Sequence, residues 1–120
     1  MNLPYPQTET TLEQTQKLID LGINHLLADV EDYIPRWSLA NLISMLPTYI
    51  GHKNLVITND FVGYMEHNAD DIHWPFLYKG NIYDSCIACI EWLIKEKYLD
   101  KKYLNEEFSY NPRRKNTLDR

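Results

Sequence analysis

Two cysteines, Cys86 and Cys89, have the Cys-x-x-Cys spacing that is used by redox dithiols and by halves of zinc sites. In a redox pair the first cysteine normally opens a helix, where the helix dipole lowers the thiol pKa. Cys86 instead falls about four residues into a predicted helix, on its apolar side, and there is no second Cys-x-x-Cys. We therefore predict two buried thiols that pack as small hydrophobic side chains, with no metal and no cofactor bound.

The polar segment from Glu66 to His73 brings three carboxylates and two imidazoles within eight residues. Such side chains can bind a metal ion or act as a general base, so a small metal-dependent enzyme is one interpretation. A loop between strands is also where solvated polar residues collect, and we favour that interpretation. The sequence contains no Gly-x-Ser-x-Gly, no phosphate-binding loop and no dinucleotide fingerprint, so we expect a protein that is not an enzyme. The enzyme alternative would use Glu66, His67, Asp70 and His73.

Trp92 lies on the last predicted helix, about 140° from the centre of its apolar arc and near Ser85 and Ala88. An exposed tryptophan beside small residues is typical of an anchor at a protein interface. The pattern predicts a partner-binding patch made of Trp92, Ala88 and Ser85. The alternative is that later side chains fold back and cover the indole, namely Tyr103, Leu104 and Phe108.

Charge is distributed unevenly along the 120 residues, whose net charge is −5. Residues 1–100 contain six basic and fourteen acidic side chains, whereas residues 101–120 carry a net charge of +3. An acidic body repels phosphate backbones, so we expect no binding of nucleic acid except through the basic tail. In that tail Arg113 and Arg114 could contact a phosphate or an acidic partner. The competing interpretation is a solvated terminus that aids solubility.

Two helices are predicted in the first half of the chain. Thr10 and Glu13 form a predicted capping box for a helix over residues 11–21, and Gly22 has the place of a left-handed C-cap. Ser38 is the predicted N-cap of a short second helix, which ends before Pro47. Trp37 before this cap can pack on Leu42.

The apolar period then changes from 3.6 to 2, which predicts three strands. They cover residues 55–58, 61–66 and 72–78, and residues 67–71 loop out between the last two. Pro75 places the third strand at a sheet edge, with Ile72, Trp74 and Phe76 facing inward. A third helix over Ile82–Leu99 has an apolar arc covering about half its circumference, so we expect it to lie across the sheet.

The expected fold is therefore an α+β single domain, with a small three-stranded antiparallel sheet packed against about three helices. It occupies residues 8–100, and a weakly structured basic extension follows over residues 101–120. No apolar run approaches the roughly 18–20 residues of a membrane helix, so we expect no membrane association. The N-terminal residues lack a secretion signal, and two cysteines cannot form a disulfide scaffold. We expect a cytoplasmic protein, with a virion as the alternative location.

Several segments between about residues 10 and 99 resemble a loose group of small uncharacterised proteins of bacteria, prophages and phages. The resemblance implies a phage or mobile-element context and a single-domain fold, and it carries no activity, cofactor or catalytic residue. The segments are Thr11-Leu12-Glu13-Gln14, Leu18-Ile19-x-Leu21-Gly22-Ile23, Ala28-Asp29, Pro35-x-Trp37-Ser38-Leu39 with Leu42 and Leu46-Pro47, and Cys89-Ile90-Glu91-Trp92-Leu93-Ile94.

The leading hypothesis is a non-enzymatic module that binds a protein partner stoichiometrically. One form is a virion or assembly component whose terminal arms order on docking. The other is a small acidic inhibitor or immunity-type protein that masks a basic surface. A homo-oligomer is a further arrangement that the sequence allows.

Overall fold

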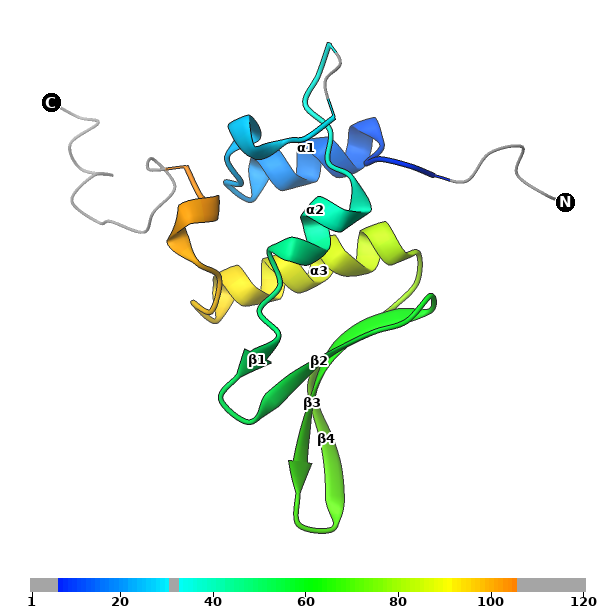
Figure 1. Cartoon of the computed structure of the whole chain (residues 1–120), viewed down its shortest axis with the longest axis vertical. Coiled ribbons are helices and arrows are strands. Elements are labelled where there is room, and N and C mark those ends of the chain that lie inside the picture. The colour runs from blue at the N-terminus through cyan, green and yellow to red at the C-terminus, as the bar shows by residue number, and fades with distance from the viewer. Residues whose placement is uncertain (1–6, 31–32, 106–120) are drawn as a thin grey trace, which may run out of the picture.

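The third helix of the chain is the central element of the fold, with the other two helices on one side of it and the sheet on the other (Figure 1). The computed structural model describes residues 7–30 and 33–105. The α+β class and the antiparallel sheet are confirmed, but the sheet has four strands and not the three predicted. The helices are α1 (Leu12–Asp20), α2 (Leu39–Ser44) and α3 (Ile82–Lys95), and the strands are β1 (Tyr49–Ile50), β2 (Lys53–Ile57), β3 (Phe61–Asn68) and β4 (Asp71–Lys79).

The capping box of α1 lies one residue later than predicted. Thr11 is the N-cap and accepts a hydrogen bond from the Gln14 backbone N–H, while the Gln14 side chain accepts from the Thr11 N–H. Thr10 is fully buried, and its hydroxyl accepts from the Trp37 backbone N–H. Thr10 therefore ties the start of α1 to the start of α2, which no local spacing indicates.

The predicted left-handed glycine at the end of α1 is confirmed: Leu21 is the C-cap, and Gly22 after it has a φ of +93°. The Gly22 N–H donates to Ile19 O at 3.0 Å and the Ile23 N–H donates to Leu18 O at 3.1 Å. These two bonds satisfy the last carbonyls of the helix. Ile23 is fully buried, as such a cap requires of the residue that follows it.

The predicted Ser38 cap of α2 is also confirmed. Its hydroxyl accepts from the Asn41 N–H and donates to the Asp29 carboxylate, which also accepts from the Ser38 N–H. Partial burial raises the pKa of Asp29, but the hydrogen bonds from Ser38 and Asn41 outweigh it and hold the pKa below the usual value. Trp37 and Leu42 are both fully buried in the core, as predicted.

The sheet has the order β1-β2-β3-β4, with every neighbouring pair antiparallel. Pro75 is therefore on an edge strand, as predicted. Tyr64 pairs with Phe76, but Glu66 pairs with His73, so Trp74 and Pro75 together lie opposite Met65 in a β-bulge. The extra residue reverses the alternation of side chains along β4.

This reversal corrects the prediction that Ile72, Trp74 and Phe76 share the inner face. Phe76 is on the inner face, where its ring stacks on Trp92 of α3 at 5.3 Å. Trp74 instead meets the ring of Phe61 edge-on at 5.7 Å, on the outer face with Gly63. Ile72 is 56% exposed.

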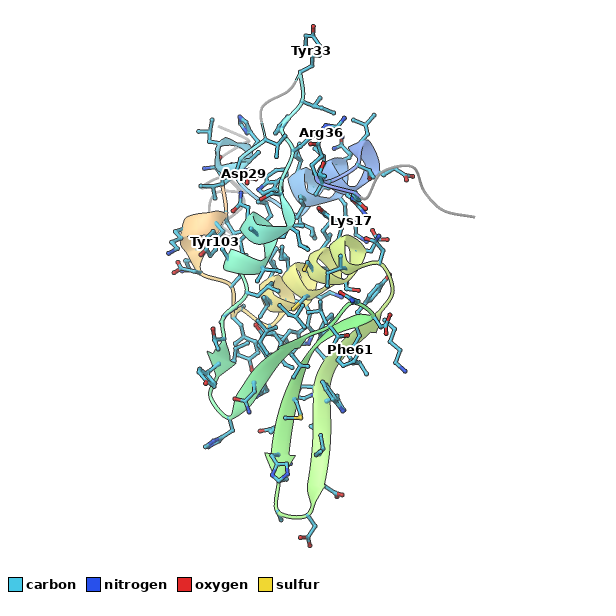
Figure 2. All side chains as sticks on the ribbon, turned by 45° about the vertical axis from the view of Figure 1, so that its right-hand side comes forward. Lys17, Asp29, Tyr33, Arg36, Phe61 and Tyr103 are labelled. Atoms are coloured by element: carbon cyan, nitrogen blue, oxygen red, sulfur yellow. The ribbon has the colours of Figure 1, made fainter. Side chains whose placement is uncertain are left out.

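The polar segment at residues 67–71 is not the loop that was predicted. Strands β3 and β4 continue through it to a turn at Ala69 and Asp70, with Asn68 paired to Asp71. In Figure 2 this end of the hairpin projects away from the helices. Polar side chains do not prevent a ladder, because the backbone groups form the pairs.

Helix α3 ends four residues before the predicted Leu99, because Lys97 adopts a left-handed conformation with φ +64°. The Tyr98 N–H then donates to Leu93 O at 2.8 Å, and Leu99 turns back into the core. The described chain continues past the predicted boundary at 100 into a 3-10 helix at Lys101–Tyr103. Leu104 there forms an isolated bridge with Ile23.

Residues on opposite sides of α3 are buried because the helix lies between two layers. Tyr64 of β3 is fully buried beneath it, and its hydroxyl donates to Pro47 O at 2.6 Å. The buried residues of α3 are Tyr83, Ser85, Cys86, Ile87, Cys89, Ile90 and Leu93. Within the described residues, no helix is long and apolar enough to cross a membrane.

Candidate protein-binding site

The two cysteines are free and buried in α3, as the sequence predicted. Burial raises the pKa of the Cys86 thiol to about 11. Burial, with the nearby Cys86, raises the pKa of Cys89 further. A thiol of this kind is protonated at neutral pH and is a poor nucleophile. Cys86 and Cys89 are therefore core residues, and their spacing reflects packing within α3.

The four residues of the enzyme alternative are not brought together. Glu66 and His73 are directly opposite each other on β3 and β4, but His67 pairs with Ile72 on the other face of the hairpin. Asp70 lies in the turn. Within the part of the chain that the structure describes, no three His, Cys, Asp or Glu side chains form a group that could hold a metal ion.

The expected exposed position of Trp92 is corrected by its ring contacts. The indole lies between α3 and the sheet, 5.5 Å from the Tyr64 ring and 5.3 Å from the Phe76 ring, with Tyr98 at 5.5 Å on a further side. The indole packs against the sheet. Of the three residues in the alternative, Phe108 lies outside the described residues, and the Tyr103 hydroxyl donates to Ser44 O. The face of α3 that carries Trp92 packs on the sheet. Trp92 is therefore a packing residue between the two layers.

The other members of the predicted patch have separate places. Ser85 is fully buried and its hydroxyl donates to Gly80 O. Ala88 is half-buried and lines a groove on the side of α3 that meets α1. Arg113 and Arg114 lie outside the described residues.

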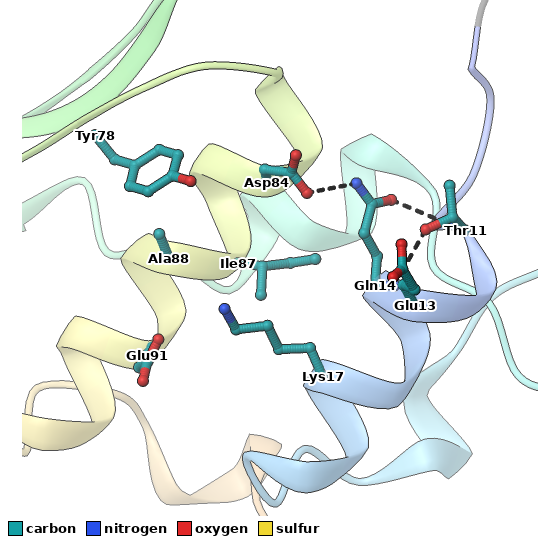
Figure 3. A pocket seen from close by; sticks show the side chains of 9 residues that line it. All are labelled: Thr11, Glu13, Gln14, Lys17, Tyr78, Asp84, Ile87, Ala88 and Glu91. Atoms are coloured by element: carbon teal, nitrogen blue, oxygen red, sulfur yellow. Dashed lines mark hydrogen bonds between the residues drawn. The ribbon is translucent and has the colours of Figure 1, made fainter.

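We call this groove the α1–α3 groove (Figure 3). It has a volume of about 340 Å³ and opens to solvent between α1, α3 and the end of β4. Its lining consists of Thr11, Glu13, Gln14, Lys17, Tyr78, Asp84, Ile87, Ala88 and Glu91.

Helical spacing explains why these side chains share one groove. Asp84, Ala88 and Glu91 are four and three residues apart on α3, so they form one stripe along it. Glu13 and Lys17 form the facing stripe on α1. The Gln14 side chain accepts from the Thr11 N–H and donates to Asp84 at 2.7 Å, which joins the two stripes at one end.

The lining combines an apolar floor with a charged rim. Ile87 is 2% exposed and forms the floor with Ala88, while Tyr78 reaches in from β4 and is 40% exposed. Three carboxylates face one ammonium group, so the charged lining has a net charge of −2. An apolar floor and a negative rim are the features that a side chain with an apolar stem and a positive end would complement.

Lys17 is the only basic residue that lines this groove within the described chain, and its side chain reaches across toward α3 (Figure 3). It forms no ion pair or side-chain hydrogen bond with any residue that the structure describes. The Lys17 ammonium group therefore lines the groove without a fixed contact to its carboxylates.

Sequence reasoning placed Ala88 in a binding patch but missed the rest of the groove. The stripe Asp84, Ala88 and Glu91 is visible as an i, i+4, i+7 pattern. Nothing in the sequence indicates that Lys17 and Glu13 face it, because that depends on the packing of α1 against α3. Comparisons with protein-family models, with curated protein sequences and with solved structures found no match to this chain.

Proposed function

We propose that the chain is a non-enzymatic protein-binding module that engages a basic surface of its partner through the α1–α3 groove. The observation that carries the proposal is the groove itself, where Glu13, Asp84 and Glu91 surround an apolar floor and only Lys17 opposes them. The proposal assigns no catalytic residue and no cofactor.

Electrostatics favour a basic partner over an acidic one. Residues 1–100 have a net charge of −8, and the carboxylates of the groove add a local concentration of negative charge. Opposite potentials on two proteins accelerate their encounter and disfavour like-charged competitors. The apolar floor supplies the burial that a stable contact needs in addition to charge.

The biological setting belongs to the same proposal. Resemblance to small phage and prophage proteins supports a mobile-element origin, and we propose the host cytoplasm as the site of action. Of the two forms considered, an acidic inhibitor or immunity-type protein agrees better with the groove than a virion component does, because masking a basic surface requires an acidic one.

The proposal is tested by affinity capture from a lysate of the native host, using the wild type and two charge variants. The first variant, Glu13→Lys with Glu91→Lys, reverses the charge of the groove. The second, Asp20→Lys with Glu96→Lys, changes the net charge equally but outside the groove, at the last residue of α1 and at the C-cap of α3. We expect a partner that the wild type and the second variant retain and that the first variant loses.

Salt provides an independent measurement on the retained partner. Its affinity for the wild type is expected to fall between low and high salt, since exposed charge pairs are screened within about 10 Å at 0.1 M salt. Equal retention by both variants would contradict the role of the groove. A wild type that retains nothing would leave no protein-binding function to assign.

A further inference from the structure

Resting on that function, we propose that the α1–α3 groove receives an arginine side chain of the partner, and that Lys17 is the side chain that the arginine displaces. The group recognised is then a guanidinium group, and Lys17 is its resident competitor. Four features of the groove support it.

The first feature is the floor. Ile87 is almost fully buried and Ala88 has only a methyl group, so the middle of the groove is low and apolar. In Figure 3 the Ala88 side chain lies between those of Tyr78 and Glu91. The three-carbon stem of arginine can lie on such a surface while its charged end remains near the rim.

The second feature is the aromatic wall. Tyr78 comes from β4, where its pairing with the buried Val62 places it on the inner face of the sheet, and it remains 40% exposed beside α3. A planar guanidinium group stacks on an aromatic ring more readily than an ammonium group does. The wall therefore favours arginine over lysine.

The third feature is the arrangement of acceptors. Asp84 is fixed by the hydrogen bond from the Gln14 side chain, and Glu91 lies two helical turns further along α3. A guanidinium group has five N–H donors in a planar fork and can satisfy acceptors on more than one side. An ammonium group is a compact point charge with three donors and has no such fork.

The fourth feature is Lys17 itself. Its extended side chain crosses the groove and places a cation beside α3, so the groove already accommodates a long basic side chain. Because Lys17 has no fixed partner among the described residues, moving it out breaks no ion pair. It competes with an incoming cation by charge repulsion and by occupancy.

The test is an NMR titration of the full chain with N-acetyl-arginine amide, N-acetyl-lysine amide and the neutral isostere N-acetyl-citrulline amide. We expect the arginine derivative to shift the signals of Ala88, Tyr78 and Ile87. The lysine derivative is expected to bind more weakly, and the citrulline derivative is expected to leave these signals unchanged.

Two groove variants should change the affinity in opposite directions. Lys17→Gln removes the competitor and is expected to tighten binding of the arginine derivative, whereas Glu91→Gln is expected to weaken it. Each change is about 2–5-fold, the range of one exposed charge pair. The matched controls are Lys95→Gln, at the last residue of α3, and Glu96→Gln, at its C-cap; both positions are exposed and outside the groove and should leave the affinity unchanged.

The inference is overturned if the arginine derivative shifts no groove signal up to its solubility limit. Equal binding of citrulline or lysine would also overturn it, as would weaker binding to Lys17→Gln. These results are distinguishable from failure of the proposed function. If groove-dependent capture of a partner persists while arginine does not bind, the basic surface is recognised in another way.

Discussion

The two halves of the β3–β4 hairpin share one backbone ladder but differ in what covers them. The proximal half, residues 61–65 with 74–79, lies under α3, and Val62 and Tyr64 there are fully buried. In the distal half, residues 66–68 with 71–73, only Glu66 is partly buried, and the other side chains are exposed. Hydrogen bonding thus extends the hairpin well past the point where burial stops.

The difference shows which interactions hold each half. In the proximal half the Trp92 ring contacts the rings of Tyr64 and Phe76. Burial of this aromatic surface stabilises the packing of the strands against α3. The distal half has cross-strand pairs such as Glu66 with His73 but no second layer. A two-stranded hairpin without such a layer is marginally stable in water.

The largest effect is expected from Tyr64→Ala. It removes a fully buried ring and the hydrogen bond to Pro47 O, so the free energy of unfolding should fall by about 3–5 kcal/mol. Glu66→Ala is the matched control, because Glu66 is on the same strand and face but beyond α3. Its effect is expected within about 0.5 kcal/mol. Urea unfolding of both variants measures the difference, and equal losses would remove the distinction between the halves.

Gly63→Ala should have an intermediate effect on the proximal half. A Cβ atom at this position would lie 2.8 Å from the backbone oxygen of Phe76 and 3.1 Å from the Trp74 ring. The strands would have to separate, which costs about 1–3 kcal/mol. Thermal or urea unfolding gives the value, and unchanged stability would show that the strands are not closely apposed there.

The smallest effect is expected from Ala69→Gly at the distal turn. Ala69 has a φ of +43°, which glycine adopts without the penalty of a side chain. We expect slower hydrogen exchange of the amides near the turn and a change of at most about 0.5 kcal/mol in global stability. Asp70→Gly is the control, because Asp70 has no positive φ. Faster hydrogen exchange of these amides in Ala69→Gly would contradict the claim that the Ala69 backbone is strained.

Local signals in the sequence predicted the elements wherever a cap or a period marks them. Gly22, Ser38 and Pro47 set the limits of α1 and α2, since each acts within a few residues of the chain. The end of α3 was predicted four residues too late, because Lys97 adopts a left-handed conformation that is usually found at glycine. Strand β1 has only two residues and so no period to detect. The polar tip of the hairpin has the composition of a loop but the pairing of a strand.

The candidate site was less accessible to sequence reasoning than the fold. Trp92 lies outside the predicted apolar arc of α3 because the prediction assumed that one side of the helix is buried. In the structure one side of α3 packs on α1 and α2 and the other on the sheet. The groove requires α1 and α3 to pack with Glu13 and Lys17 facing Asp84 and Glu91. Tertiary packing sets that geometry, and one chain's sequence contains no pattern for it.

Pro75 affects how this protein behaves toward other strands. It belongs to β4, whose outer side has no neighbouring strand among the described residues, and it has no N–H to offer. Together with the bulge, it interrupts the row of backbone groups that a foreign strand would need to extend the sheet. A proline and a bulge on an edge strand both disfavour edge-to-edge polymerisation of the hairpin.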